Sequence, residues 1–364
     1  MSLHVNIKKQ LKNFLLEVKF DAKEGVLGVL GASGSGKSVT LKCIAGLITP
    51  DEGEIVLNGK VLFDSKKNID ISPQKRKIGY LFQSYALFPN MTVEENILIG
   101  MSEKDFAKRK KVLYDFIELL QLQGLEKQYP KQLSGGQQQR VAFARLLAYN
   151  PEVLLLDEPF SALDSHLKEQ LQIQLKEILK GYQKTSVMVS HDRNEIYRLC
   201  ERTMTMKSGE LLQIGQTKDV FLKPEDPVTA RLTGWRNLSN IIFLNENQVK
   251  AIEWNMVFHI VDCMDKKQEY NVVGLHENDV ILSKEKSQNN NCFYVEIIEI
   301  LEEYSKYSLL VKSVEEGNHY QIPSLENHQQ ALWCTLDKIE GQKWKQGEKA
   351  WFTIDVNKIK WLHS

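Results

Sequence analysis

The chain alternates, up to about residue 235, between short apolar runs and longer segments of mixed polarity. Apolar runs at 26–30, 153–156 and 185–190 are typical of strands buried on both faces of a parallel sheet. Apolar residues recur at helical spacing over 39–45 and 167–181. Strands and helices that take turns along a chain predict an α/β fold, with a mostly parallel sheet covered by helices.

After Trp235 the segments become short, rich in β-forming residues and separated by polar turns. The stretch 350–356 alternates, so that Phe352, Ile354 and Val356 are expected on one buried face of a strand. A small β-barrel or sandwich is the natural interpretation of this part. The expected domains are an α/β domain over 1–235 and a β-rich domain over 236–364.

Composition narrows the function classes. Lysine plus arginine number 47 and aspartate plus glutamate also number 47, which argues against binding nucleic acid through a strongly basic surface. The five cysteines are scattered and form no CxxC pair, which favours reduced thiols over disulfides or a zinc site. No apolar stretch approaches the roughly 20 residues that cross a bilayer, so a membrane role is expected to come through partners.

Residues 31–38 fit the phosphate-binding pattern G-x-x-x-x-G-K-[ST] and stand between a predicted strand and a predicted helix. A glycine-rich turn there lets backbone N–H groups surround a phosphate at the positive end of the helix. Lys37 is expected to reach the β- and γ-phosphates, and the Ser38 hydroxyl to ligate Mg²⁺. The expected nucleotide-binding residues of this segment are Gly31, Ala32, Ser33, Gly34, Ser35, Gly36, Lys37, Ser38 and Val39.

A second motif, LSGGQ at 133–137, is more discriminating, because phosphate loops occur in many nucleotide enzymes. An amphipathic helical pattern follows it, and the apolar run 153–156 then ends in Asp157 and Glu158. Together these features resemble the ATP-binding-cassette (ABC) ATPase family. The resemblance implies a P-loop ABC ATPase domain with a helical subdomain over about 104–132, followed by a small β-barrel-like C-terminal domain with a regulatory or ligand-binding role.

The resemblance also implies the chemistry of the site, with ATP and Mg²⁺ as its cofactors. Asp157 would hold Mg²⁺ together with Ser38 and Gln83, and Glu158 would act as the base that polarises the attacking water. His191 would contact the γ-phosphate, so that the expected catalytic residues are Glu158, His191 and Gln83.

Family members stack the adenine ring on an aromatic residue ahead of the phosphate loop. This chain offers Phe14 and Phe20 there. Phe20 alternates with Val18 and is expected in the core, so Phe14 is the expected stacking residue.

The LSGGQ motif implies a homodimer, because in the family it binds the ATP that the opposite subunit holds. Two composite sites follow, each closed by nucleotide. The residues expected to contact the partner's ATP are Ser134, Gly135, Gly136, Gln137 and Asp164.

The segment 85–97, YALFPNMTVEENI, resembles that of importer ATPases for sugars, oxyanions and polyamines. Phe82, Tyr85, Leu87 and Phe88 either belong to the core or line an apolar groove that receives a helix of a partner. The resemblance therefore implies transmembrane permease subunits, an indirect link to a substrate-binding protein, no nucleic-acid partner, and a place at the cytoplasmic face of the membrane.

The short N-terminal segment and the junction TGWRN at 233–237 favour a molybdate or tungstate importer, although Trp235 and Arg236 depart from the TGCKN form of that subgroup. Importers of sulfate, ferric iron, polyamine or sugar are the alternatives. A soluble ABC ATPase that acts on DNA or ribosomes is a third class. Such proteins usually carry two cassettes or a long coiled-coil insertion, and neither is found in this sequence.

Overall fold

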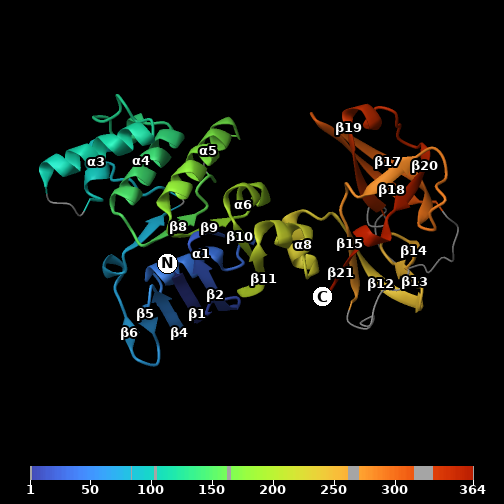
Figure 1. Ribbon diagram of the computed structural model, residues 1–364, viewed down its shortest axis with the longest axis horizontal. Helices are drawn as coiled ribbons and strands as arrows, with labels where there is room; N and C mark the ends of the chain where they lie inside the picture. The colour runs from blue at the N-terminus through green and yellow to red at the C-terminus, as the bar shows by residue number, and fades with distance from the viewer. Residues whose placement is uncertain are drawn as a thin grey trace. The chain divides into compact units, whose positions relative to one another are not determined.

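The computed structural model describes residues 2–82, 84–101, 105–161, 165–260, 270–314 and 331–363, with the backbone alone for 165–167. Its contacts divide the chain into two compact units, Met1–Val220 and Phe221–Ser364. Each unit has its own hydrophobic core. They are drawn in Figure 1, from blue at the N-terminus to red at the C-terminus, and are described separately below.

An eleven-stranded sheet forms the frame of the N-terminal unit, in the order β6-β5-β4-β1-β2-β11-β10-β3-β9-β8-β7. Strands β10, β3, β9, β8 and β7 run parallel to one another, and β1, β2, β4, β5 and β6 pair antiparallel with one another. Between these two groups, β11 pairs antiparallel with β10 and parallel with β2. The strands are β1 (Ser2–Gln10), β2 (Leu15–Lys23), β3 (Gly25–Gly31), β4 (Glu52–Leu57), β5 (Lys60–Asp64), β6 (Ile69–Asp70), β7 (Ile78–Leu81), β8 (Val153–Asp157), β9 (Thr185–Ser190), β10 (Arg202–Lys207) and β11 (Glu210–Gln216).

The pattern of side chains explains both halves of this sheet. Every residue of β8 and β9 is buried, as their continuous apolar runs predict for central parallel strands. In β2 buried and exposed residues alternate strictly, which leaves one face for solvent, and Phe20 lies in the core as expected. Because β3, β7, β8 and β9 are parallel, their carboxyl ends meet at one edge of the sheet.

Some helices of this unit cover the sheet, and others form a separate group beyond its edge. The helices of this unit are α1 (Lys37–Ala45), α2 (Val93–Leu98), α3 (Phe106–Leu119), α4 (Gly135–Ala148), α5 (Ser165–Tyr182), α6 (Arg193–Leu199) and α7 (Thr217–Leu222), with short 3-10 turns η1 (Pro73–Lys75) and η2 (Pro130–Gln132). Helices α2, α3 and α4 pack on one another and form the predicted helical subdomain, in cyan and green in Figure 1. The predicted α/β domain with a helical subdomain is confirmed.

The boundary between the units falls within α7, and the first whole helix of the C-terminal unit is α8 (Pro227–Thr233). This unit contains two five-stranded antiparallel sheets, β14-β13-β12-β15-β21 and β16-β20-β17-β18-β19. Side chains of both sheets meet in one core around Trp254, Phe258 and Phe352. The β-rich C-terminal domain is thus confirmed. Its other elements are β12 (Asn237–Asn245), β13 (Gln248–Ala251), β14 (Met256–His259), β15 (Val272–Leu275), β16 (Val280–Ser283), β17 (Cys292–Glu302), β18 (Lys306–Ser313), β19 (Ala331–Asp337), α9 (Lys338–Gly341), β20 (Lys349–Ile354), η4 (Val356–Lys358) and β21 (Lys360–Leu362).

One strand prediction is wrong at its end. Val356 was expected on the buried face beside Phe352 and Ile354, but β20 stops at Ile354. The carboxylate of Asp355 accepts a hydrogen bond of 3.0 Å from the backbone N–H of Asn357 and starts the turn η4 there. Val356 is consequently only partly buried.

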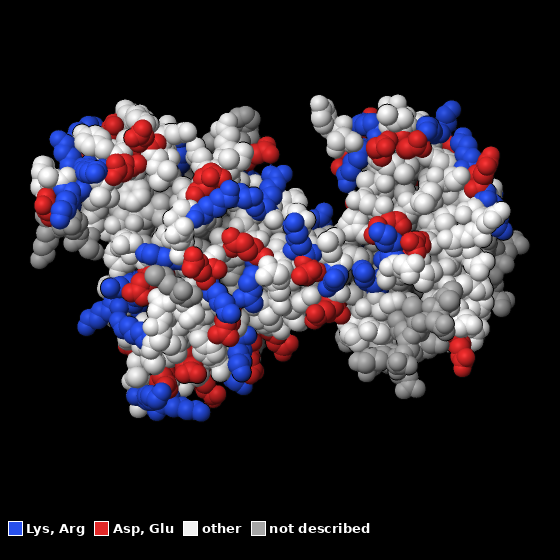
Figure 2. Space-filling view, in the orientation of Figure 1, with Lys and Arg blue, Asp and Glu red and all other residues white. Residues whose placement is uncertain are grey.

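Two surface features bear on partners. Basic and acidic side chains are interspersed over the face drawn in Figure 2 rather than gathered into one basic surface. None of the helices in the described parts of the chain is both long and apolar enough to cross a bilayer.

Candidate functional site

The turn between β3 and α1 is shaped to surround an anion. Gly34 has a φ of +80° and Gly36, the N-cap residue of α1, has a φ of +101°, which other residues rarely adopt. The buried Lys37 turns back along this turn, and its Nζ donates to the carbonyl oxygens of Gly31 at 2.7 Å and Ala32 at 2.8 Å. The first-turn N–H groups of α1 and the Lys37 ammonium therefore lie together.

The charge of Lys37 is sensitive to its surroundings. Burial lowers the pKa of Lys37, and the nearby carboxylates of Glu158 and Asp157 oppose that shift. A polyanion such as a nucleotide phosphate would add to the carboxylates' effect and favour the charged ammonium.

Asp157 lies at the carboxyl end of β8 and is held on both oxygens. Ser38 Oγ donates to Asp157 Oδ1 at 2.7 Å, and the phenolic oxygen of Tyr80, on the neighbouring strand β7, donates to Asp157 Oδ2 at 2.7 Å. Burial and this hydrogen bond raise the pKa of Tyr80, so the phenol keeps the proton that it donates. A hydroxyl and a carboxylate so placed beside a phosphate loop fit the oxygen ligands that Mg²⁺ prefers.

Glu158, the next residue, has a left-handed backbone with a φ of +47°, which is uncommon outside glycine. The surrounding loop fixes it: its N–H donates to Val189 O at 3.1 Å, and its carbonyl accepts from the backbone N–H and the hydroxyl of Ser161. Strain of this kind is often stored at functional sites, where it aims a side chain.

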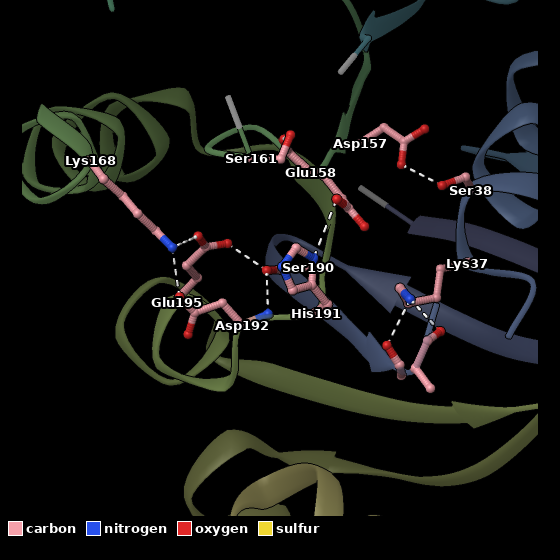
Figure 3. A network of polar contacts seen from close by, with 12 residues as sticks. Lys37, Ser38, Asp157, Glu158, Ser161, Lys168, Ser190, His191, Asp192 and Glu195 are labelled. Atoms are coloured by element: carbon pink, nitrogen blue, oxygen red, sulfur yellow. Dashed lines mark hydrogen bonds and ion pairs between the residues drawn. The ribbon is translucent and has the colours of Figure 1, made fainter. Parts of the chain in front are cut away.

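His191 follows the end of β9 and faces Glu158. Its Nδ1 lies 3.3 Å from Glu158 Oε2, and Figure 3 shows the ring turned toward that carboxylate. The predicted residues Lys37, Ser38, Asp157, Glu158 and His191 thus come from three neighbouring parallel strands and meet at one edge of the sheet.

A cavity of about 330 Å³ lies at this edge. Phe14 is in its wall, next to the phosphate loop, as an adenine-stacking residue would be. The residues that line it are Leu11, Phe14, Ser33, Gly34, Gly36, Lys37, Ser38, Val39 and Glu158.

The LSGGQ residues lie elsewhere, at the N-terminus of α4. Ser134 is the N-cap residue, and it forms a reciprocal capping box with Gln137. Ser134 and Gly135 are exposed, whereas Gly136 is buried. None of these residues is in the wall of the cavity described above, so within one chain the structure does not bring them to the phosphate loop.

Two of the expected site residues, Gln83 and Asp164, lie outside the described residues.

Sequence reasoning missed Tyr80 and also Gly209, which supports the phosphate loop. The N–H of Gly209 donates to Ser35 O at 3.0 Å, and its carbonyl accepts from Glu17 N at 2.8 Å. A Cβ at Gly209 would collide with the carbonyl of Leu15 and the ring of Phe14. The signals in the sequence were a tyrosine inside the short strand β7 and a Ser-Gly turn.

Arg145, on α4, was also missed. Its guanidinium donates to the carbonyl oxygens of Ala86 at 2.8 Å and Tyr85 at 3.0 Å, two consecutive residues with left-handed backbones. It also lies 5.3 Å from the centre of the Phe88 ring. The segment that follows Gln83 is thereby tied to the helix that LSGGQ begins.

A second cavity, of about 440 Å³, opens between α2 and α3 in the helical subdomain. Its apolar wall includes Leu98, Leu113 and Ile117, and Phe106 beside them is 79% exposed. Glu94, Lys110 and Lys127 add charge to the cavity wall.

Phe88 is 44% exposed, but Tyr85 is buried, so of the segment 82–88 only part belongs to the core.

Comparison with known proteins places these features in context. A model of the family described as ABC transporter matches residues 15–161. The sulfate/thiosulfate import ATP-binding protein of Mesostigma viride is 36% identical over 297 residues, which cover 78% of this chain and 80% of that protein. The spermidine/putrescine import ATP-binding protein of Clostridioides difficile (strain 630) is 35% identical over 339 residues, or 92% and 88% of the two chains.

Among solved structures, the chain is similar to a dimeric ATP-binding cassette in a post-hydrolysis state, bound to ADP and Pi. The TM-score is 0.51 with 33% sequence identity, and the match covers 60% of this chain and 99% of the other. The segment matched by the family model carries the phosphate loop, LSGGQ, and Asp157 and Glu158 at the end of β8.

Proposed function

Because the chain belongs to the ABC transporter family, we propose that it is the ATP-hydrolysing subunit of a membrane importer. The observation that carries the proposal is the meeting of Lys37, Ser38, Asp157, Glu158 and His191 at one sheet edge beside a phosphate-sized turn. We place the protein at the cytoplasmic face of the membrane, held there by permease subunits.

Each residue then has a distinct task toward MgATP. The N–H groups of α1 and Lys37 bind the phosphates, and Ser38 and Asp157 hold Mg²⁺, with Gln83 as a further expected ligand. When bound, Mg²⁺ neutralises charge on the phosphate oxygens. As the water oxygen bonds to the γ-phosphorus and the bond from that phosphorus to the bridging oxygen of the leaving ADP breaks, Glu158 accepts a proton from the water. His191, whose Nδ1 lies 3.3 Å from the Glu158 carboxylate, would contact the γ-phosphate. Phe14 stacks the adenine.

We further propose that two copies form a homodimer with composite sites. Ser134, Gly135, Gly136, Gln137 and Asp164 of one subunit would contact the ATP held by the other. Two facts support this arrangement: Ser134 and Gly135 are exposed at a helix N-terminus away from the cavity of their own chain, and the similar solved cassette is dimeric.

The cavity between α2 and α3 is the proposed docking place for a helix of the permease. An exposed phenylalanine beside an apolar wall, with charged residues in the cavity lining, suits an amphipathic helix laid into a groove. Outside this cavity, Arg145 ties Tyr85 and Ala86, in the segment that resembles that of importer ATPases, to the LSGGQ helix.

For the cargo, we propose sulfate or thiosulfate, which are named in relatives such as that of Mesostigma viride. Spermidine or putrescine is the second candidate, because the polyamine relative matches 92% of this chain, including most of the C-terminal unit. The comparisons give no support to the expected molybdate or tungstate, and they favour two of the alternatives instead.

Uptake into proteoliposomes tests the proposal. The chain would be reconstituted with the permease and binding protein encoded beside it, and uptake of labelled sulfate, thiosulfate, spermidine and molybdate measured with and without ATP. ATP-dependent uptake of sulfate or thiosulfate, absent with Glu158→Gln, is the expected result. Uptake of spermidine alone would select the second candidate, and ATP hydrolysis without uptake of any solute would contradict the importer role.

A further inference from the structure

A second network of charged side chains lies behind His191. Lys168, near the start of α5, places its Nζ 2.6 Å from Asp192 Oδ2 and 2.7 Å from Glu195 Oε1. Figure 3 shows the Lys168 side chain reaching from α5 to both carboxylates, while His191 points the other way, toward Glu158. Two acidic residues on the His191 side of the unit thus share one lysine.

The network holds both neighbours of His191. Ser190 Oγ donates to Glu195 Oε2 at 2.5 Å and accepts a hydrogen bond of 2.9 Å from the N–H of Asp192. Asp192 also accepts from Asn194 N at 2.9 Å and so begins α6. His191 therefore stands between two residues whose side chains are fixed.

Lys168 is the cation that stabilises these two carboxylates in the interior of the unit. Glu195 is 4% exposed and Ser190 is 2% exposed, and a buried carboxylate without a counter-ion is strongly unfavourable. Burial lowers the pKa of Lys168, but its hydrogen bonds to Asp192 and Glu195 raise that pKa more, so the ammonium stays charged. Without Lys168 the carboxylates of Asp192 and Glu195 would repel each other.

We propose that Lys168 is a positioning residue, which keeps His191 beside Glu158 by pairing with Asp192 and Glu195. Because α5 begins directly after Asp164 in the sequence, the same contact joins the segment expected to meet the partner subunit to the histidine of the site. The inference rests on the proposed ATPase function, and it adds a residue that does not touch the nucleotide.

The test compares three variants of the full chain. Lys168→Met removes the cation, Lys168→Arg keeps it, and Lys180→Met removes an exposed lysine of the same helix that pairs with Glu177. For Lys168→Met we expect kcat for ATP hydrolysis to fall about tenfold or more while KM for ATP stays within about twofold. Lys168→Arg should restore most of kcat, and Lys180→Met should resemble the wild type.

Hydrogen exchange of the amides in 191–199 gives a readout that does not depend on hydrolysis. Faster exchange there in Lys168→Met, but not in Lys180→Met, supports the inference even if the wild-type chain hydrolyses no ATP, a result that would contradict the proposed function alone. Unchanged exchange with an unchanged kcat would overturn the positioning role. So would a loss of kcat and ATP affinity together with a lower Tm, if Lys168→Arg did not reverse it.

Discussion

The phenolic oxygen of Tyr80 lies 2.7 Å from Asp157 Oδ2, and the two residues are on adjacent parallel strands, β7 and β8. Since Ser38 occupies Oδ1 of the same carboxylate, Asp157 is held at both oxygens. A carboxylate that accepts a hydrogen bond at each oxygen cannot rotate freely, so it is already oriented to bind a metal ion. Tyr80 is thus a support for the proposed Mg²⁺ site, although no motif includes it.

Tyr80→Phe should weaken the use of Mg²⁺ more than the use of ATP. The variant keeps the ring and loses only the hydroxyl, so Asp157 gains freedom to rotate away from Ser38. We expect the Mg²⁺ concentration for half-maximal ATPase activity to rise about tenfold, as is typical when a residue that supports a metal ligand is lost. Activity measured against Mg²⁺ at saturating ATP checks this.

Tyr182→Phe is the matched control. Tyr182 is another tyrosine with a hydrogen-bonded hydroxyl, whose OH donates to Pro151 O at 2.7 Å, away from the phosphate loop. Both variants should lose about 0.5–1.5 kcal/mol of stability, the usual net contribution of a hydrogen bond, because each acceptor keeps another donor. If Tyr182→Phe changed the Mg²⁺ dependence as much as Tyr80→Phe, the supporting role of Tyr80 would be wrong.

Glu158→Gln should bind ATP and fail to hydrolyse it. Lys37, Ser38 and Asp157 still hold MgATP, while the amide cannot take the proton of the attacking water. We expect ATP affinity within about threefold of the wild type, loss of turnover, and a nucleotide-bound dimer that persists in gel filtration. Hydrolysis near the wild-type rate would exclude Glu158 as the general base.

The residues of the site that sequence alone predicted are those whose chemistry is local. The phosphate loop is contiguous, and Asp157 and Glu158 end an apolar run that could hardly be anything but a central strand. The LSGGQ motif is likewise contiguous, and the structure closes it with a local capping box between Ser134 and Gln137. Each of these signals lies within a few residues, so pattern and structure coincide.

The residues that were missed act across long separations. Tyr80 and Asp157, Arg145 and Tyr85, and Lys168 and Asp192 meet only after the sheet and helices have packed. Composition changes at Trp235, which is a local signal in the sequence. The contact of Trp235 is not local: its side chain is buried within the C-terminal unit, and its Nε1 donates to Phe221 O at 2.9 Å.

Asp192→Asn should lower the stability of the folded protein near neutral pH and have little effect at acidic pH. Burial raises the pKa of Asp192, but hydrogen bonds from Lys168 and from the backbone lower it more, and the net pKa is below the ordinary 3.8. The ionised carboxylate therefore stabilises the folded state above about pH 4, and this contribution is lost as pH falls through the lowered pKa.

Calorimetry between about pH 3 and pH 7 checks this expectation. The wild type should melt at a higher temperature than Asp192→Asn near neutral pH, and the difference should shrink toward pH 3. In the Lys168→Met background the pH dependence of that difference should be much weaker, because the main cause of the shift has been removed. A constant difference at all pH values would show that Asp192 acts only as a helix cap.

Mixing two inactive variants tests the composite sites. Lys37→Ala damages the phosphate-binding side and Ser134→Arg damages the LSGGQ side, so each homodimer should be inactive at both of its sites. In a mixed dimer one site carries both lesions, and the other combines an intact Lys37 with the intact Ser134 of the second chain. We expect activity to return on mixing, up to about a quarter of the wild-type rate: random pairing makes half of the dimers mixed, and each has one working site.

Ser134 and Gly135 are exposed and lie away from the cavity that Lys37 lines. The mixing experiment therefore distinguishes LSGGQ residues that serve the partner's ATP from LSGGQ residues that serve the ATP of their own chain. If the LSGGQ residues served their own chain, the site of each subunit would carry that subunit's own lesion, and mixing would restore nothing. A failure to recover would also arise if both sites had to fire together. Crosslinking distinguishes these cases: a bond between cysteines introduced at Ser33 of one chain and Ser134 of the other, formed only with ATP, would retain the composite arrangement. Its absence would refute it.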